Sequence, residues 1–324
     1  MSLFKVLPGI ELPVREVSPT LSEMWAVDRE GSGEFRASQM NLILHFGIKT
    51  TEEEAQERFQ TAVRFGQRYP CRIIVLCPRT EDSNSWEMLS AKLFTQCYIG
   101  DSLREMCCCE ALMLSYNTRE FVHLRNQVSV WLEADLPTVH WFHQVPADRI
   151  QNQYLSFIYS FRRILFDRAV EGEAYDGIAW PRPNRVVDIT SARLLPIKQS
   201  LGPFLAGFSP EELIEGLEAI HFWVHSDFQG EGKQLRDWVF SCLEHCFSEK
   251  EEAKRITLKT HDSDDESTCL RMRWKRAEGN LLEWQVNPEG QVHIEAHFRN
   301  QALSRNQFIE WISPEMELSE SIFF

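Results

Sequence analysis

Apolar residues near the start of the chain fall into two short runs separated by a helical repeat. Residues 36–46 and 72–77 are rich in apolar side chains and predict two strands, the second of them buried. Between them apolar positions recur at helical spacing. Thr51 and Glu54 have the spacing of a capping box, so residues 52–68 predict an amphipathic helix. Strand, helix and strand within about forty residues predict a βαβ crossover.

The same patterns continue through the first half of the chain. An extended, proline-marked segment is expected at residues 1–17 and a short helix at 18–27. The later elements expected are a hairpin at 91–98 and 106–116, helices at 118–133 and 147–160, and strands at 138–142 and 163–166. Together they predict an α/β domain over residues 1–170, with a mixed sheet flanked by helices.

A loop rich in glycine and proline, residues 171–184, marks the expected domain boundary. Residues 217–225 fit either a helix or a strand, and their alternating apolar positions favour a strand. The other elements expected are helices at 190–201, from Ser209, at 232–247 and at 304–312, and strands at 255–258, 268–274, 281–286 and 291–298. Turn residues, including the acidic loop 261–267, separate the last strands. They predict an α+β domain over residues 171–324 that ends in an antiparallel meander.

Composition narrows the classes of function. The chain is 43% hydrophobic, which is ample for a packed core. Its net charge of -14 opposes binding to a phosphate backbone, so no nucleic-acid partner is expected. The first residues carry charges and prolines and no long apolar run, so neither a signal peptide nor a membrane span is expected. Nine cysteines without CxxC spacing fit a reducing cytoplasm.

Cys107, Cys108 and Cys109 are adjacent in an apolar segment. Neighbouring residues of a strand point to opposite faces, so these thiols are not expected to hold one metal ion together. Buried, inert thiols are the interpretation that this setting favours. A vicinal disulfide or a redox-sensing thiol stays open, because it depends on exposure and on a lowered pKa.

Candidate reaction centres are weak elsewhere in the chain. His140 and His143 have a spacing that sends their rings apart on a strand. The pairs His221 with His225 and His293 with His297 lack an HExxH pattern, so no metal is expected. There is no GxSxG elbow and no P-loop, and the turn after residue 46 has one glycine instead of GxGxxG. We therefore expect no catalytic residue and no cofactor, on an α/β scaffold kept for binding.

Trp180 and Arg182 stand in the loop between the expected domains, with Arg185 close behind. Tryptophan and arginine are the residue types enriched at the energetic centres of protein interfaces. An ordinary linker with a covered tryptophan explains the loop equally well.

Four segments in order resemble the glucose-6-phosphate dehydrogenase assembly proteins of the OpcA type. They are Arg36-Ala37-x-x-Met40-Asn41-Leu42-Ile43, Tyr69-Pro70-Cys71-Arg72-Ile73-Ile74-Val75-Leu76, Cys108-Cys109-Glu110-Ala111-Leu112 and Asp135-Leu136-Pro137-Thr138-Val139-His140-Trp141. Trp180-Pro181-Arg182 is similar to the family's Trp-x-Arg segment, although Pro183-Asn184 replaces its apolar continuation. The positions carried over as family-motif or partner-binding residues are Arg36, Asn41, Pro70, Arg72, Cys109, Glu110, Asp135, Pro137, Trp141, Trp180 and Arg182.

This resemblance implies a non-catalytic, cytoplasmic protein whose partner is glucose-6-phosphate dehydrogenase, the entry enzyme of the oxidative pentose phosphate pathway. Such a protein promotes assembly of the enzyme or activates it allosterically. The alternative is a cysteine- or metal-dependent enzyme of unrecognised type that uses Cys107–Cys109 or a histidine cluster. A third hypothesis is a regulator of the same dehydrogenase whose binding responds to thiol oxidation.

Overall fold

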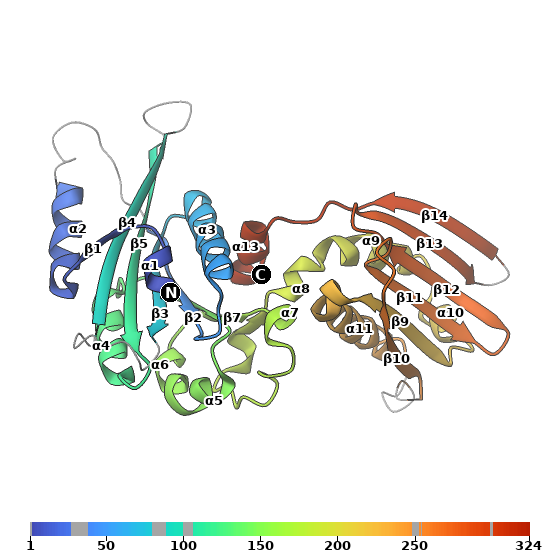
Figure 1. Cartoon of the computed structure of the whole chain (residues 1–324). Coiled ribbons are helices and arrows are strands. Elements are labelled where there is room, and N and C mark those ends of the chain that lie inside the picture. The colour runs from blue at the N-terminus through green and yellow to red at the C-terminus, as the bar shows by residue number, and fades with distance from the viewer. Residues whose placement is uncertain are drawn as a thin grey trace. The chain divides into compact units, whose positions relative to one another are not determined.

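The computed structural model describes residues 2–26, 38–79, 89–99, 106–247, 253, 255–298 and 301–324. The chain divides into two compact units (Figure 1). The first comprises Met1–Ile189 and Pro314–Phe324, and the second comprises Thr190–Ser313. The sequence placed the boundary between residues 170 and 171. The later division follows from β8 (Val186–Asp188), which pairs in parallel with β7 (Arg163–Phe166) and so extends the sheet of the first unit.

The first unit is built on an eight-stranded mixed sheet in the order β1-β4-β5-β3-β2-β6-β7-β8. The strands not yet given are β1 (Ile10–Leu12), β2 (Met40–Phe46), β3 (Cys71–Arg79), β4 (Leu89–Ile99), β5 (Met106–Asn117) and β6 (Thr138–His143). The six neighbouring strands from β5 to β8 in this order run parallel to one another. Beyond β5 the sheet continues with β4, which is antiparallel to β5, and then with β1, which is antiparallel to β4. In chain order these six lie as 3-2-1-4-5-6, the arrangement of doubly wound nucleotide-binding sheets.

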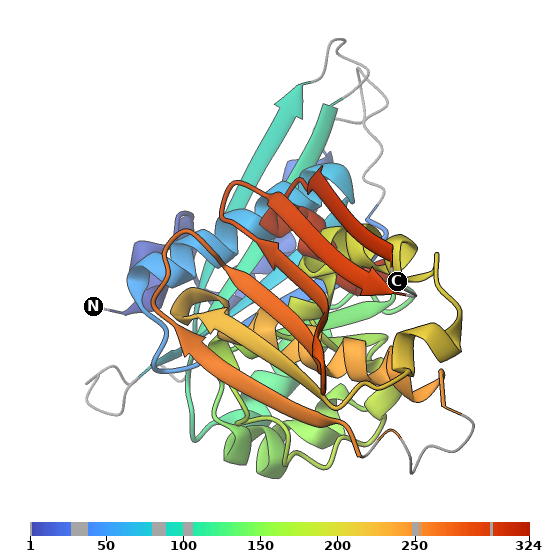
Figure 2. The same cartoon turned by 90° about the vertical axis from the view of Figure 1, so that its right-hand side faces the viewer.

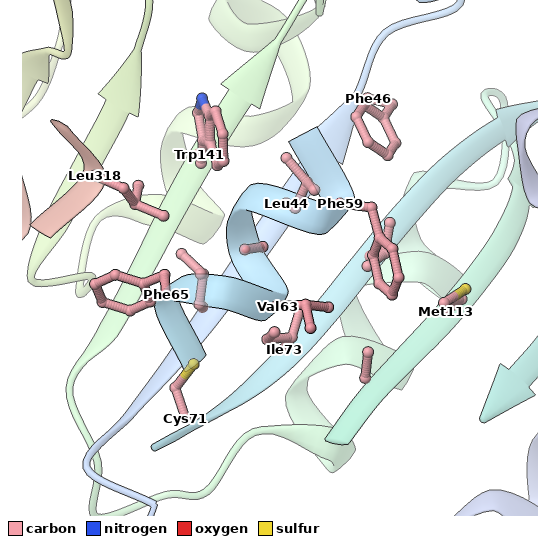
Figure 3. Packing of buried hydrophobic residues seen from close by; sticks show 14 of the residues in the cluster. Leu44, Phe46, Phe59, Val63, Phe65, Cys71, Ile73, Met113, Trp141 and Leu318 are labelled. Atoms are coloured by element: carbon pink, nitrogen blue, oxygen red, sulfur yellow. The ribbon is translucent and has the colours of Figure 1, made fainter. Parts of the chain in front are cut away.

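Helices cover both faces of this sheet. On one face α3 (Glu52–Arg68), α13 (Pro314–Phe323) and the short α1 (Leu3–Val6) enclose a core that Figure 3 shows from close by. There Phe59 and Phe65 of α3 lie among side chains of β2, β3, β5 and β6. On the other face α2 (Val17–Ala26), α4 (Phe121–Trp131) and the helical turns at 147–158 enclose a second core. The predicted α/β class with a mixed, helix-flanked sheet is confirmed.

The second unit contains a six-stranded sheet in the order β10-β9-β11-β12-β13-β14. The strands are β9 (Ala219–His225), β10 (Thr257–Ser263), β11 (Leu270–Arg276), β12 (Gly279–Val286), β13 (Gln291–Phe298) and β14 (Gln301–Phe308). β10 pairs with β9 in parallel and the other pairs are antiparallel. The described helices include α8 (Thr190–Arg193), α9 (Leu195–Leu205), α10 (Pro210–Ile214) and α11 (Gln229–Glu244). Residues of α9, α10 and α11 pack on one face of the sheet (Figure 2).

Several local predictions are confirmed and others are wrong. The ambiguous segment at 217–225 is the strand β9, because its even residues enter the core and its odd residues do not. The predicted helix at 304–312 is wrong. Residues 304–308 belong to β14, whose Ser304 faces Glu295 of β13, residues 309–313 are irregular, and the last helix follows only at Pro314. The expected acidic loop is partly strand, since β10 extends to Ser263. The first 17 residues, expected to be extended, also contain α1 and β1.

Candidate functional site

The carboxyl edge of the parallel sheet is the first place to look for a site. The chain leaves β2 towards β3 on one side, while β6 lies on the other side. This reversal of strand order is the point at which doubly wound sheets bind their ligands. Gly47 follows β2 at this point, and Gln144 follows β6.

The two turns at this point are in direct contact. A Cβ added to Gly47 would lie 1.6 Å from the carbonyl oxygen of Gln144, so only glycine fits there. Gln144 has a φ of 57°, and its amide N–H donates to Glu171 Oε1 at 2.6 Å. Its side-chain Nε2 donates to Glu54 Oε1 at 2.7 Å. The chain's own groups therefore take up the hydrogen bonds that a ligand at this edge would use.

The N-terminus of α3 is unfavourable for binding an anionic ligand. In a doubly wound sheet the helix after the first strand receives the pyrophosphate of a dinucleotide. Here the backbone N–H of Glu54 donates to Thr51 Oγ1 at 3.2 Å, and the N–H of Thr51 donates to Glu54 Oε2 at 2.8 Å. The first turn also carries Glu52 and Glu53. Negative charge placed at this end stabilises the helix and repels phosphate.

Burial shifts the pKa values of two titratable groups at this edge, His143 and Glu171, in favour of their neutral forms. Burial lowers the pKa of His143 to about 4, although its Nε2 lies 4.0 Å from Glu54 Oε1. Burial likewise raises the pKa of Glu171 to about 7. Tyr175 donates its hydroxyl to the carbonyl of Val145 at 2.6 Å. Nowhere in the described ranges do three or more His, Cys, Asp or Glu side chains gather in a way that would hold a metal ion.

Most of the family-motif residues gather at the opposite, amino edge of the sheet. Asn41 donates its Nδ2 to the carbonyl of Glu133 at 3.0 Å and accepts the N–H of Glu133 on its Oδ1 at 3.0 Å. Arg72 donates to Glu110 Oε1 at 2.7 Å and to the carbonyl of Trp131 at 2.8 Å, and pairs with Glu133 Oε1 at 2.7 Å. These bonds join the starts of β2 and β3 to β5 and to the segment that ends α4.

Burial gives this amino-edge cluster a structural role. Asn41 is 0% exposed and Glu110 is 3% exposed. An unpaired charge or amide at such a position is costly, and the network satisfies both. Of the other motif residues, Trp141 is buried in the core, Pro70 is half-buried, and Asp135 and Pro137 are exposed. Arg36 lies outside the described residues. Partner binding by these positions stays a prediction.

The cysteine segment is described in part. Cys109 has no exposed surface and packs against Gly66 of α3. The side chains of Cys107 and Cys108 lie outside the described part of the chain. Cys97 on β4 is disulfide-bonded. Cys109 is therefore a core residue, as the buried-thiol interpretation expected.

The loop with Trp180 and Arg182 joins the core to the surface. The guanidinium of Arg182 lies 4.3 Å from the ring centre of the exposed Tyr159, and its hydrogen bond lowers the pKa of that phenol. Trp180 is half-buried and meets Tyr175 edge to face at 6.3 Å. Arg185 donates to the carbonyl of Phe161 at 2.8 Å. Trp180 therefore packs against neighbouring side chains, while Arg182 lies over the exposed ring of Tyr159.

A buried chain of histidines and tyrosines was missed by the sequence reasoning. His45 Nδ1 lies 3.1 Å from His140 Nε2, and His45 Nε2 lies 2.7 Å from the hydroxyl of Tyr116, which is 3.4 Å from that of Tyr154. Burial lowers the pKa of His45 to about 3 and holds that of His140 well below its usual value. Each histidine interrupts an apolar strand, but only the β2–β6 register brings them together.

Part of the chain matches a known protein family. Residues 62–179 match the family described as glucose-6-phosphate dehydrogenase subunit N-terminal domain, which confirms the resemblance to the OpcA-type assembly family. No curated protein matches the chain. No helix in the described ranges is long and apolar enough to cross a membrane.

Two solved structures are distantly similar. The first is KijD10, a 3-ketoreductase from Actinomadura kijaniata, at 7% identity and a TM-score of 0.40 over 87% of this chain and 88% of that one. The second is a putative oxidoreductase, yvaA, from Bacillus subtilis, also at 7% identity and 0.40, over 85% and 86%. Likenesses this distant carry no conclusion about function.

Proposed function

We propose that this chain is a non-catalytic protein that binds glucose-6-phosphate dehydrogenase and promotes its assembly or activates it allosterically. The observation that carries the proposal is the match of residues 62–179 to the dehydrogenase assembly family. The setting would be the cytoplasm, at the entry to the oxidative pentose phosphate pathway.

The carboxyl edge of the sheet supports a binding role over a dehydrogenase role. A dinucleotide would need a glycine-rich turn and an open helix N-terminus at this edge. The chain instead has Gln144 against Gly47, and Glu54 capping its own helix. The scaffold keeps the strand order of a nucleotide-binding sheet, while its ligand position is filled by internal hydrogen bonds.

The described thiols and histidines give the alternative enzyme little support. Cys109 is fully buried, and burial holds the pKa of the Cys77 thiol at about 12, far from the thiolate that chemistry requires. His45 and His140 are each used in hydrogen bonds inside the core. No specific observation favours a second function.

A partner activates an enzyme only when it binds the enzyme's two states with different affinities. The chain shifts an equilibrium between two states of the dehydrogenase only by the difference in its affinity for them. A preference of about 1–3 kcal/mol changes the populations by roughly 5- to 150-fold. Tight binding without such a preference would leave the enzyme's activity and assembly unchanged.

The test mixes the purified chain with the dehydrogenase of its own organism. We expect the complex to appear as a new mass in light scattering, together with a change in the enzyme's kcat/KM or in its oligomer mass. Repeating the kinetics at a dehydrogenase concentration at which it is already fully assembled separates the two modes, because only allosteric activation persists there. An unchanged mass together with unchanged kinetics would contradict the proposal.

A further inference from the structure

The sheet of the second unit has one face that its own helices do not cover. In β9 the even residues Ile220, Phe222 and Val224 enter the core formed with α9 and α11. The odd residues of the same strand lie on the opposite face, and the register of the neighbouring strands continues that alternation. Figure 2 shows this sheet without helices in front of it.

Trp223 lies on this open face in β9, one strand in from the edge strand β10. Its ring stacks on His221 of the same strand, with ring centres 5.7 Å apart, and on His261 of β10 at 5.2 Å. On the β11 side the guanidinium groups of Arg273 and Arg271 lie 5.1 Å and 5.9 Å from the tryptophan ring centre. We call these five residues the Trp223 patch.

The patch has the opposite charge to the chain as a whole. The chain carries a net charge of -14. On the open face of the four strands that run from β10 to β12, the register places Lys259, Lys275, Arg271 and Arg273 against the single carboxylate Glu283. Further along, β13 adds Glu295 and the imidazoles of His293 and His297. Asp265, which follows β10, is a further carboxylate close to Arg271. The strands themselves concentrate positive charge around Trp223 on an otherwise acidic protein.

The two arginines are held in place before any partner arrives. Glu283 on β12 lies opposite Arg273 on β11, and its carboxylate accepts hydrogen bonds from Arg273 Nη2 at 2.9 Å and Nε at 3.0 Å. The same carboxylate accepts Nε of Arg271 at 2.8 Å. Fixing a long side chain in advance removes part of the entropy cost of binding. One shared carboxylate leaves N–H donors on both guanidinium groups for a second anionic group.

We propose that the Trp223 patch is the docking surface for an acidic patch on the partner dehydrogenase. Carboxylates of the partner bind Arg271, Arg273 and Lys259, and an apolar side chain between them covers Trp223. This assignment rests on the proposed function. Buried tryptophan and arginine contribute most of the binding energy in many interfaces, and opposite charges set orientation and association rate.

Single-stranded nucleic acid is the competing occupant for a basic, aromatic sheet face. Such sites stack successive bases on several aromatic rings along a continuous positive groove. Among the described residues of this face, the other large aromatic ring is Phe308, which lies on the far edge strand β14, so no row of rings follows the basic residues around Trp223. Glu283 also offsets part of the arginine charge. The net charge of -14 also repels a polyanion at long range. An acidic protein surface therefore fits the observations better.

The experiment measures the affinity of the full-length chain for the dehydrogenase at two salt concentrations. The variants are the double change Arg271→Gln with Arg273→Gln, the change Trp223→Ala, and Lys259→Glu at an exposed position on the edge strand. Arg236→Gln is the matched control, because Arg236 is a partly exposed arginine on α11, which packs on the other face of the sheet. Circular dichroism and the thermal midpoint establish that each variant is folded.

We expect the double variant and Trp223→Ala to weaken binding by at least about tenfold, and Lys259→Glu to slow association, with Arg236→Gln close to wild type. The double variant is also expected to have a smaller salt dependence than wild type. If the double variant, Trp223→Ala and Lys259→Glu all bind the dehydrogenase as the wild type does, the docking surface is overturned and the proposed function is left standing. No binding by the wild-type chain would overturn both. Tighter binding of an oligo-dT probe than of the enzyme, abolished by the double variant, would overturn the choice of occupant.

Discussion

The sheets of the two units hold similar side chains in opposite environments, buried in the first unit and on an open face in the second. The sheet of the first unit is covered on both faces, and it encloses an Arg–Glu pair, a histidine pair and large aromatic residues. The sheet of the second unit is covered by its own helices on one face and carries an Arg–Glu cluster, stacked histidines and Trp223 on the other. The same residue types are enclosed in the core in one place and lie on an open sheet face in the other, where we propose that a partner binds.

Tryptophan substitutions should separate the two sheets most strongly. Trp141→Ala removes a side chain that is 3% exposed in the first unit's core, so we expect unfolding to become easier by about 4 kcal/mol. Trp223→Ala on the open face is expected to cost about 1 kcal/mol, because that ring is half-buried and polar groups surround it. Urea titration followed by circular dichroism compares them, and equal losses would contradict the distinction.

The two ion-pair clusters form a second matched comparison. Glu110→Ala leaves the buried guanidinium of Arg72 without the more deeply buried of its two carboxylate partners, and we expect a loss of about 3 kcal/mol. Glu283→Ala removes the carboxylate shared by two partly exposed arginines, and a loss of about 1 kcal/mol or less is expected. The same denaturation assay measures both. A larger loss for Glu283→Ala would show that the open cluster is structural.

Acid should destabilise the first unit through its buried histidines. Burial lowers the pKa of His45 to about 3 and that of His143 to about 4, so the unfolded chain binds more protons than the folded one below about pH 6.5. The contribution of these two histidines is therefore full above pH 6.5 and declines towards pH 4, by up to about 1.4 kcal/mol per pH unit for each. Glu171, whose pKa burial raises to about 7, acts in the opposite direction between about pH 7 and 4.5, so the net decline is smaller. His143→Gln should flatten this slope, whereas the exposed His297→Gln should not. A pH-independent free energy of unfolding would contradict the neutral, buried state.

Thiol accessibility gives the smallest and most local contrast. A maleimide at neutral pH should label Cys242, which is exposed on α11, within minutes, while Cys77 and Cys109 stay unmodified until the protein unfolds. Mass spectrometry of peptides reads the sites directly. Modification of Cys109 in the folded protein would reopen the thiol-based alternatives.

Much of the fold was predictable because its local signals are strong. The capping box at Thr51 and the helical repeat after it placed α3 at residues 52–68, which is where it lies. Alternation identified β9, and turn residues identified the antiparallel strands β11 to β13. The prediction at 304–312 was wrong because Ser304, which in sequence looks like a helix cap, lies inside β14, and its pairing with Glu295 of β13 decides the structure there.

The proposed docking surface was much less predictable. The motifs that name the family are made largely of buried residues such as Asn41, Glu110 and Trp141, so they identify the scaffold. Arg271, Arg273 and Trp223 belong to no motif, and they meet only because β9 and β11 pair in one register. The same holds for His45 and His140, which are far apart in the chain and adjacent in the sheet.

Patterns within the chain therefore specify helices, strands and the family, because periodicity and capping act over a few neighbouring residues. Strand order and register specify which polar side chains meet, because those contacts join residues of distant segments. At the carboxyl edge, tertiary contacts place Gln144 and Glu54 where a doubly wound sheet would hold a ligand. At the open face of the other sheet, they gather the arginines around Trp223.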